Sequence, residues 1–292
     1  MMIKSKGEKT FDCINIGLMI LLTLMFVLPV VYIVSTSFSS NTAITKHGYS
    51  LIIRDFSTDW YKFIFSAQDL FLGSMVNSVF MTFTATFFMV IVASLYAYAV
   101  SRKQTQFKKF FITLLIIPML FAGGTIPYYL TIYNLGLMNS QWAIILPSSV
   151  NAWYIILIKN YFGGLPDSLC EAAQLEGANN VQTLFKVVLP LGFPIVATVI
   201  LYSAVAIWND WFQASLFLDS AHKNLWPVQA VVRELNNSIE SLQSAAGSGA
   251  SMVNSEGVKS AAVVISTLPI VIVYPFLQRF FISGVLVGSV KE

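Results

Sequence analysis

EAAQLEGANNVQTLFKVVLP, residues 171–190, is a polar segment that stands between long hydrophobic stretches of the chain. Ser168 and Glu171 have the spacing of a capping box at a helix start, and Gly177 stands where a helix end favours a left-handed residue. The pattern predicts a helix of about two turns. A helix this short has little reason to be ordered in water unless something packs on it. We therefore expect a docking site for a soluble partner.

A second short helix is expected directly after the first. It should begin at Asn179 or Asn180, and Pro190 marks the entry into the next hydrophobic stretch. Between them, four residues at helical spacing form an apolar stripe. These residues are Val181, Leu184, Phe185 and Val188.

The rest of the chain is dominated by apolar residues. Of 292 residues, 56% are hydrophobic and 11% charged, against roughly 25% charged in an average soluble domain. Several stretches lack Asp, Glu, Lys and Arg altogether, and about 20 apolar residues suffice to cross a bilayer. We predict an all-α polytopic membrane protein with six transmembrane helices. The expected spans are Ile14–Val34, Met75–Val100, Phe110–Tyr128, Gln141–Ile158, Leu189–Trp208 and Ser260–Leu277.

The distribution of basic residues predicts how the chain is oriented. Lys and Arg crowd the short segments before the first span and after the second, including Arg102 and Lys103, but are diluted over longer segments on the other side. The side richer in Lys and Arg is normally cytoplasmic. We expect residues 1–292 to form a single transmembrane domain with both termini cytoplasmic. In this orientation residues 159–190 are cytoplasmic and residues 210–259 form a long external loop.

The sequence lacks the residues that would let the chain hydrolyse ATP or catalyse another reaction. A phosphate-binding loop needs Lys directly after its second glycine, whereas the nearest match, Gly257–Ser260, has an inserted valine. The two cysteines and two histidines are isolated, so we predict no metal site and no cofactor bound by this chain. We also predict no catalytic residues and no nucleic-acid binding, because the basic residues flank membrane spans.

The opening segment carries a resemblance to a known family. Glu171-Ala172-Ala173, three residues, Gly177, nine residues, Val187, one residue and Leu189-Pro190 resemble the EAA loop of ABC-importer permeases, EAA-x3-G-x9-I-x-LP. The one departure is the conservative Val187 for Ile. The resemblance implies that the loop forms a coupling helix in a cleft of an ATPase subunit. It implies contacts from Glu171, Ala172, Ala173 and Gly177, with Leu189 and Pro190 closing the motif.

The resemblance extends over essentially the whole chain. The six spans, the long external loop and the ending QRFFISGVLVGSVKE (residues 278–292) resemble carbohydrate-uptake permeases of the maltose type. GGTIPYYL at 123–130 and WNDWF at 208–212 resemble a branch associated with complex oligosaccharides. This implies a multi-pass protein of the bacterial cell membrane, paired with a second permease as a heterodimer. It also implies two ATPase subunits that use ATP and Mg, and an extracytoplasmic solute-binding protein.

A sugar path through such a protein needs aromatic faces and amide or hydroxyl groups near the span ends. The candidates are Asn77, Tyr128, Asn151, Tyr154, Trp208, Asn209 and Trp211. Asn residues that join helices, and Trp and Tyr residues at the membrane interface, would explain each of them equally well. Asn151 and Asn209 are the strongest candidates, because an amide in a span seeks an interior partner.

Two other readings of the function stay open. The chain would also suit an ABC permease for another solute, such as peptide or phosphate. An ion-coupled secondary carrier is a further alternative, although no charged residue falls near the middle of a span, where such carriers use them. In the external loop, apolar residues such as Trp226 favour docking of a binding protein over a disordered surface loop.

Overall fold

The computed structural model describes residues 6–67, 69–246 and 253–289, and over these ranges the backbone is helical with a single isolated β-bridge between Ser39 and Phe56. The chain divides into two compact units. Unit 1 comprises Met1–Asp69 and Glu234–Thr267, and unit 2 comprises Leu70–Arg233 and Leu268–Glu292. The all-α prediction is confirmed.

Unit 1 contains the first span and the segment that follows it. Its helices are α1 (Lys6–Phe38), α2 (Asn41–His47) and α3 (Asp59–Ala67), together with parts of α14 (Val228–Ala246) and α15 (Val253–Ser289). The apolar side chains of α1 are exposed from Phe11 to Val31, as expected of a helix whose surroundings are lipid or another subunit. Trp60 donates from Nε1 to the carbonyl of Ser39 at 2.8 Å.

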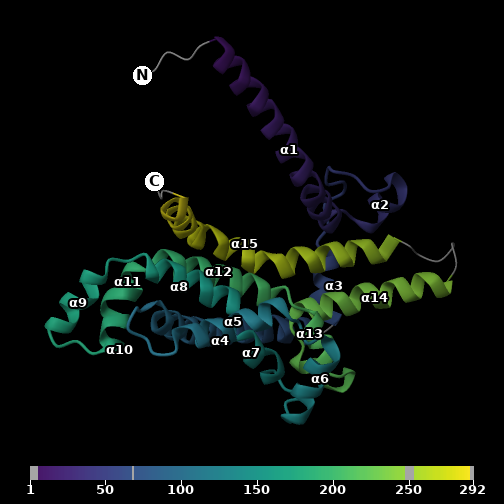
Figure 1. Cartoon of the computed structure of the whole chain (residues 1–292). Coiled ribbons are helices and arrows are strands. Elements are labelled where there is room, and N and C mark those ends of the chain that lie inside the picture. Colours follow the sequence, from purple (N-terminus) through teal and green to yellow (C-terminus); the bar gives the residue numbers. More distant parts are fainter. Residues whose placement is uncertain (1–5, 68, 247–252, 290–292) are drawn as a thin grey trace. The chain divides into compact units, whose positions relative to one another are not determined.

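Unit 2 holds the remaining helices (Figure 1). They are α4 (Asp69–Ser101), α5 (Lys108–Leu120), α6 (Thr125–Asn134), α7 (Trp142–Ser148), α8 (Ala152–Gly163), α9 (Asp167–Leu175), α10 (Asn180–Thr183), η1 (Leu184–Val188), α11 (Leu189–Leu191), α12 (Phe193–Trp208), α13 (Phe212–Phe217) and η2 (Ser220–Leu225). Within this unit, α9 and α10 lie at one end, and α6 and α13 lie at the other (Figure 1).

Helices long and apolar enough to cross a membrane number four among the described residues, or six if each of two bent pairs is one span. The four are Gly7–Phe38, Leu70–Ser101, Trp142–Gly163 and Glu256–Pro275. The predicted third span, Phe110–Tyr128, falls on one of the two bent pairs rather than on one continuous helix. The helix ends at Leu120, and the chain turns through 118° before α6, which carries Tyr128. Gly124, at φ +85°, supplies a backbone conformation that other residues rarely adopt there.

The predicted fifth span, Leu189–Trp208, is also broken, with an 82° bend between Asn180–Leu191 and Phe193–Trp208. Pro190 has no N–H, and its ring would clash with the carbonyl four residues earlier in an α-helix. The preceding residues therefore form a π-helical turn, in which Leu189 donates to the carbonyl of Leu184. The bend itself falls at Gly192.

Gly192 is needed for close packing at this bend. A Cβ atom there would lie 2.4 Å from Cε1 of Phe162 and 3.0 Å from the carbonyl oxygen of Val188. Because Phe162 is only 1% exposed, its ring has no room to move away. We expect Gly192→Ala to lower the free energy of unfolding by about 1–3 kcal/mol, seen as a lower Tm of the purified protein.

Gly163→Ala is the matched control, since no heavy atom lies within 4 Å of a Cβ at that position. It should leave the Tm unchanged. Equal Tm values for the two variants would contradict the packing proposed at Gly192.

Candidate functional site

Helix α9 begins differently from the sequence prediction. Its first helical residue is Asp167, the preceding Pro166 makes no side-chain cap, and Ser168 already lies in the first turn, so the Ser168–Glu171 capping box was a wrong prediction. A capping box occurs instead at the start of α10. There the Asn179 side chain accepts from the Gln182 N–H and the Gln182 side chain accepts from the Asn179 N–H, both at 2.9 Å. The predicted start of the second helix is confirmed.

Gly177 ends α9 as predicted. Its φ is +86°, in the left-handed region that favours glycine. The N–H of Ala178 donates to the carbonyl of Ala173 at 2.9 Å, and the N–H of Gly177 donates to the carbonyl of Gln174 at 3.0 Å. This pair of bonds is a Schellman motif. It satisfies two carbonyls that the helix end would otherwise leave unpaired, and it turns the chain sharply into α10.

The two faces of α9 have different surroundings. Cys170 is 5% exposed and packs into the core with residues of α4, α8 and α12. Leu169 is 40% exposed and Leu175 is 90% exposed. The outward face also includes the exposed Ala172, whereas Ala173 is half-buried, and Glu171 is exposed but lines the cavity described next. Leu175 was missed in the sequence, although it follows Leu169 and Ala172 at three-residue intervals along this face.

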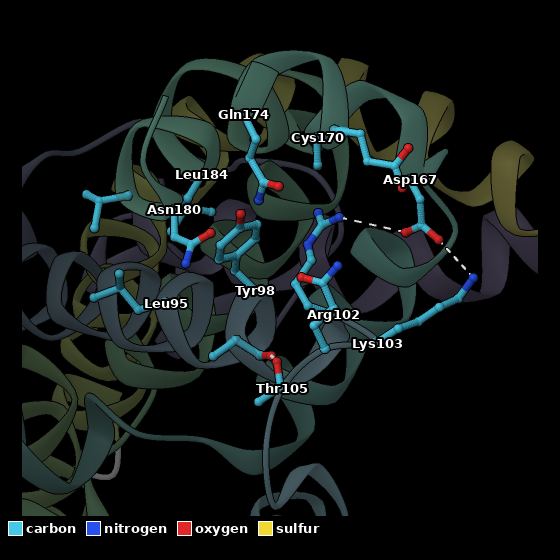
Figure 2. A pocket seen from close by; sticks show the side chains of 14 residues that line it. Leu95, Tyr98, Arg102, Lys103, Thr105, Asp167, Cys170, Gln174, Asn180 and Leu184 are labelled. Carbon is cyan, nitrogen blue, oxygen red and sulfur yellow. Dashed lines mark hydrogen bonds and ion pairs between the residues drawn. The ribbon is translucent and has the colours of Figure 1, made fainter. Parts of the chain in front are cut away.

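A cavity of about 670 Å³ lies between the inner side of α9 and the end of α4 (Figure 2). Lys103 places Nζ 2.8 Å from Oδ2 of Asp167, and Arg102 places Nη1 3.9 Å from Oδ1 of the same carboxylate. The hydrogen bond from Lys103 holds the pKa of Asp167 below its usual value. In the sequence, Arg102 and Lys103 indicated only the orientation of the chain in the membrane. The structure brings them against α9, with Glu171 lining the same cavity.

A second cavity, of about 380 Å³, unites three of the predicted solute-path residues, Tyr128, Asn151 and Tyr154. These residues come from α6 and from the start of α8, close to the end of α12. Asn151 also caps α8, since its Oδ1 accepts from the N–H of Trp153 at 2.9 Å. The cavity therefore lies where several helix ends meet, and polar side chains from these ends line it.

Four polar lining residues of this second cavity were missed in the sequence: Ser148, Ser203, Asp210 and Gln213. Tyr128 donates its hydroxyl to Oε1 of Gln213 at 2.7 Å, and Gln213 donates from Nε2 to Oδ2 of Asp210. Asp210 also accepts the backbone N–H of Gln213 on Oδ1 at 3.0 Å. Because only the fold brings α6 next to α13, no sequence pattern marked this network.

The other predicted path residues lie outside this cavity. Trp208 is 4% exposed and lines an apolar cavity of about 540 Å³ between α4, α12 and α15. Asn209 is exposed and donates to the carbonyl of Val205 in its own helix at 2.9 Å. Trp211 lies under the guanidinium of Arg233, with Cζ 4.8 Å from the ring centroid.

Asn77 is held in a different set of contacts. Its Nδ2 donates to the carbonyls of Asn224 at 2.7 Å and Trp226 at 3.1 Å, and its Oδ1 accepts from Nε2 of Gln141 at 2.9 Å. The amide therefore fastens the segment before α14 to α4 and to the residue before α7.

We expect Asn77→Ala to lower the free energy of unfolding by about 1–3 kcal/mol, because it leaves part-buried polar groups without partners. The solute concentration at half-maximal uptake should stay unchanged. Asn209→Ala is the control, and its effect should stay within about 0.5 kcal/mol. A raised half-saturating concentration with an unchanged Tm in Asn77→Ala would instead place Asn77 on the solute path.

Comparisons with known proteins give these two sites a context. Residues 64–287 match the model of the family described as binding-protein-dependent transport system inner membrane component. The chain is 37% identical over 287 residues to the polygalacturonan/rhamnogalacturonan transport system permease protein YtcP of Bacillus subtilis (strain 168), covering 97% of this chain and 99% of the relative. It is also 37% identical over 291 residues to Protein LplC of the same organism, covering 98% and 97%.

A solved structure is similar over nearly the same length. It is the crystal structure of a bacterial ABC transporter involved in the import of the acidic polysaccharide alginate. One of its chains is 32% identical with a TM-score of 0.85, covering 96% of this chain and 100% of that chain. This chain therefore belongs to the family of binding-protein-dependent transport system inner membrane components, and it is a membrane-embedded transport permease subunit.

Proposed function

We propose that this chain is one of the two permease subunits of an ATP-driven importer that carries an oligosaccharide across the bacterial cell membrane. A relative named for polygalacturonan/rhamnogalacturonan transport and a solved structure of an alginate importer support this substrate class. Residues 1–292 act as a single transmembrane domain, with residues 159–190 on the cytoplasmic side.

The observation that carries the proposal is the outward face of α9. The apolar side chain of Leu175 is 90% exposed. A partner protein that buried it would remove this apolar surface from water. In the proposed assembly, Glu171, Ala172, Ala173 and Gly177 contact the ATPase subunit, and Leu189 and Pro190 link the contact to α12. ATP and Mg belong to that partner and not to this chain.

The polar cavity of Tyr128, Asn151, Tyr154, Asp210 and Gln213 forms this subunit's share of the solute path. Carboxylate and amide groups hydrogen-bond sugar hydroxyls, and tyrosine rings pack on the apolar faces of sugar rings. Among the residues that the structure describes around this cavity, Asp210 is the one charged side chain. Such a lining suits a solute rich in hydroxyl groups.

The proposed cycle follows from these two sites. ATP binding closes the two ATPase subunits on each other and pulls the outward face of α9. The two permeases then rock from an inward-facing to an outward-facing arrangement, and the extracytoplasmic binding protein releases the oligosaccharide into the cavity. Helix α9 lies at one end of unit 2, and α6 and α13, which contribute Tyr128 and Gln213 to the cavity, lie at the other (Figure 1). The stroke therefore travels through the helices between them.

Reconstitution tests the proposal. The chain is purified from its native host with its associated subunits, and uptake into proteoliposomes is measured with labelled galacturonan and rhamnogalacturonan oligosaccharides, malto-oligosaccharides, a peptide and phosphate. ATP-dependent uptake of an oligosaccharide supports the proposal. Selective uptake of peptide or phosphate refutes the substrate class. Uptake driven by an ion gradient through the isolated chain refutes the ATP-driven importer.

A further inference from the structure

Arg102 is held in an unusual way for a cationic side chain. It directly follows α4, its Cζ lies 4.8 Å from the centroid of the Tyr98 ring, and its side chain is 19% exposed. Nη1 faces Asp167 at 3.9 Å. Nε and Nη2 are buried, and neither donates a hydrogen bond to any residue that the structure describes.

The two unpaired nitrogens form one functional edge. Nε and Nη2 point in the same direction from the planar guanidinium, and this edge binds a carboxylate through two parallel hydrogen bonds. A buried N–H without an acceptor is unfavourable and calls for an explanation. The geometry therefore leaves Arg102 with a carboxylate-binding edge that is unsatisfied in this conformation.

The cavity beside this edge contains two carboxylates, both from α9. Asp167 and Glu171 lie one helical turn apart, so they share a face of the helix. Asp167 is engaged by Lys103 at 2.8 Å. Glu171 is exposed and forms no ion pair within the described ranges, yet its charge adds to that of Asp167 in raising the pKa of Lys103. Glu171 thus lines the same cavity as Arg102 and forms no ion pair among the residues that the structure describes.

We propose that Arg102 is a positioning residue for Glu171, whose carboxylate binds the Nε–Nη2 edge in one conformation of the transport cycle and leaves it in another. This inference rests on the proposed coupling role of α9. Glu171 then alternates between a cation of its own chain and the ATPase subunit. The contact between Arg102 and Glu171 thereby couples the position of α9 to the end of α4. Formation and loss of this ion pair would transmit the conformational state of the ATPase subunit to α4, the second span.

The test uses the complete transporter in proteoliposomes and the oligosaccharide that the wild type imports best. The measured quantity is the amount of solute imported per ATP hydrolysed, for Arg102→Gln, Arg102→Lys, Glu171→Gln and the Arg102→Gln/Glu171→Gln double variant. We expect each single variant to lower this ratio about tenfold, the scale of one charge-assisted hydrogen bond. The double variant should be no worse than Glu171→Gln alone, because both changes remove the same contact.

Arg102→Lys guards against a trivial folding defect, because it keeps the charge and the apolar stem but lacks the two-donor edge. A wild-type ratio in Arg102→Lys would overturn the proposal. Additive losses in the double variant would overturn it as well. If Glu171→Gln alone keeps the wild-type ratio, the coupling role of α9 fails, which separates failure of the proposed function from failure of this inference.

Discussion

Gly177→Val is expected to reduce solute uptake strongly while the protein still inserts in the membrane and ATP hydrolysis by the partner continues. Gly177 has a φ of +86°, where a β-branched residue is a genuine outlier. The strain costs roughly 1–2 kcal/mol, enough to shift the population of the ordered α9 end by about five- to thirtyfold. Since α9 has nine residues, losing its terminal bonds displaces the whole contact surface.

Gly177→Asn is the matched control, because asparagine tolerates the left-handed region several-fold better than other residues. It should retain most of the uptake. The measurement is solute imported per ATP hydrolysed in proteoliposomes, together with the amount of ATPase that copurifies. Full coupling in Gly177→Val would show that the turn after α9 does not position the coupling contact.

Asp210→Ala is expected to lower uptake at subsaturating solute by about 10- to 150-fold, the effect of losing a hydrogen bond to a charged group worth about 1.5–3 kcal/mol. Asp210 is the charged group in the polar cavity and accepts from both the side chain and the backbone of Gln213. Its removal also frees Gln213 from the position in which it accepts the Tyr128 hydroxyl.

Two variants separate solute recognition from capping of α13. Asp210→Asn keeps an oxygen for the Gln213 N–H but removes the charge, so it should show a large part of the uptake defect with a wild-type Tm. Asp219→Ala removes an exposed aspartate that accepts from the N–H of Ala221 and His222 outside the cavity, and it should import normally. Equal uptake by Asp210→Ala and the wild type would remove this cavity from the solute path.

Much of the fold was predictable because membrane spans and helix ends depend on local sequence. In lipid, a charge-free stretch must satisfy the hydrogen bonds of its own backbone N–H and C=O groups, and it therefore forms a helix. Gly177 and Asn179 were identified as boundary residues for equally local reasons, the left-handed turn and the side-chain cap. The bends in the third and fifth predicted spans were not foreseen, because apolar character gives the length of a stretch but not the angle at Gly124 or Gly192.

The site divides along the same line. The sequence alone determined that the chain is a membrane protein, that a short helix precedes Gly177, and that Gly177 ends it. Each of these features depends on residues within one or two helical turns of each other. Only the tertiary structure placed Arg102 and Lys103 against α9, joined Tyr128 to Gln213, and gave Asn77 a fastening role. Those contacts join residues 64 to 149 positions apart, and chain folding rather than local propensity decides which polar groups meet.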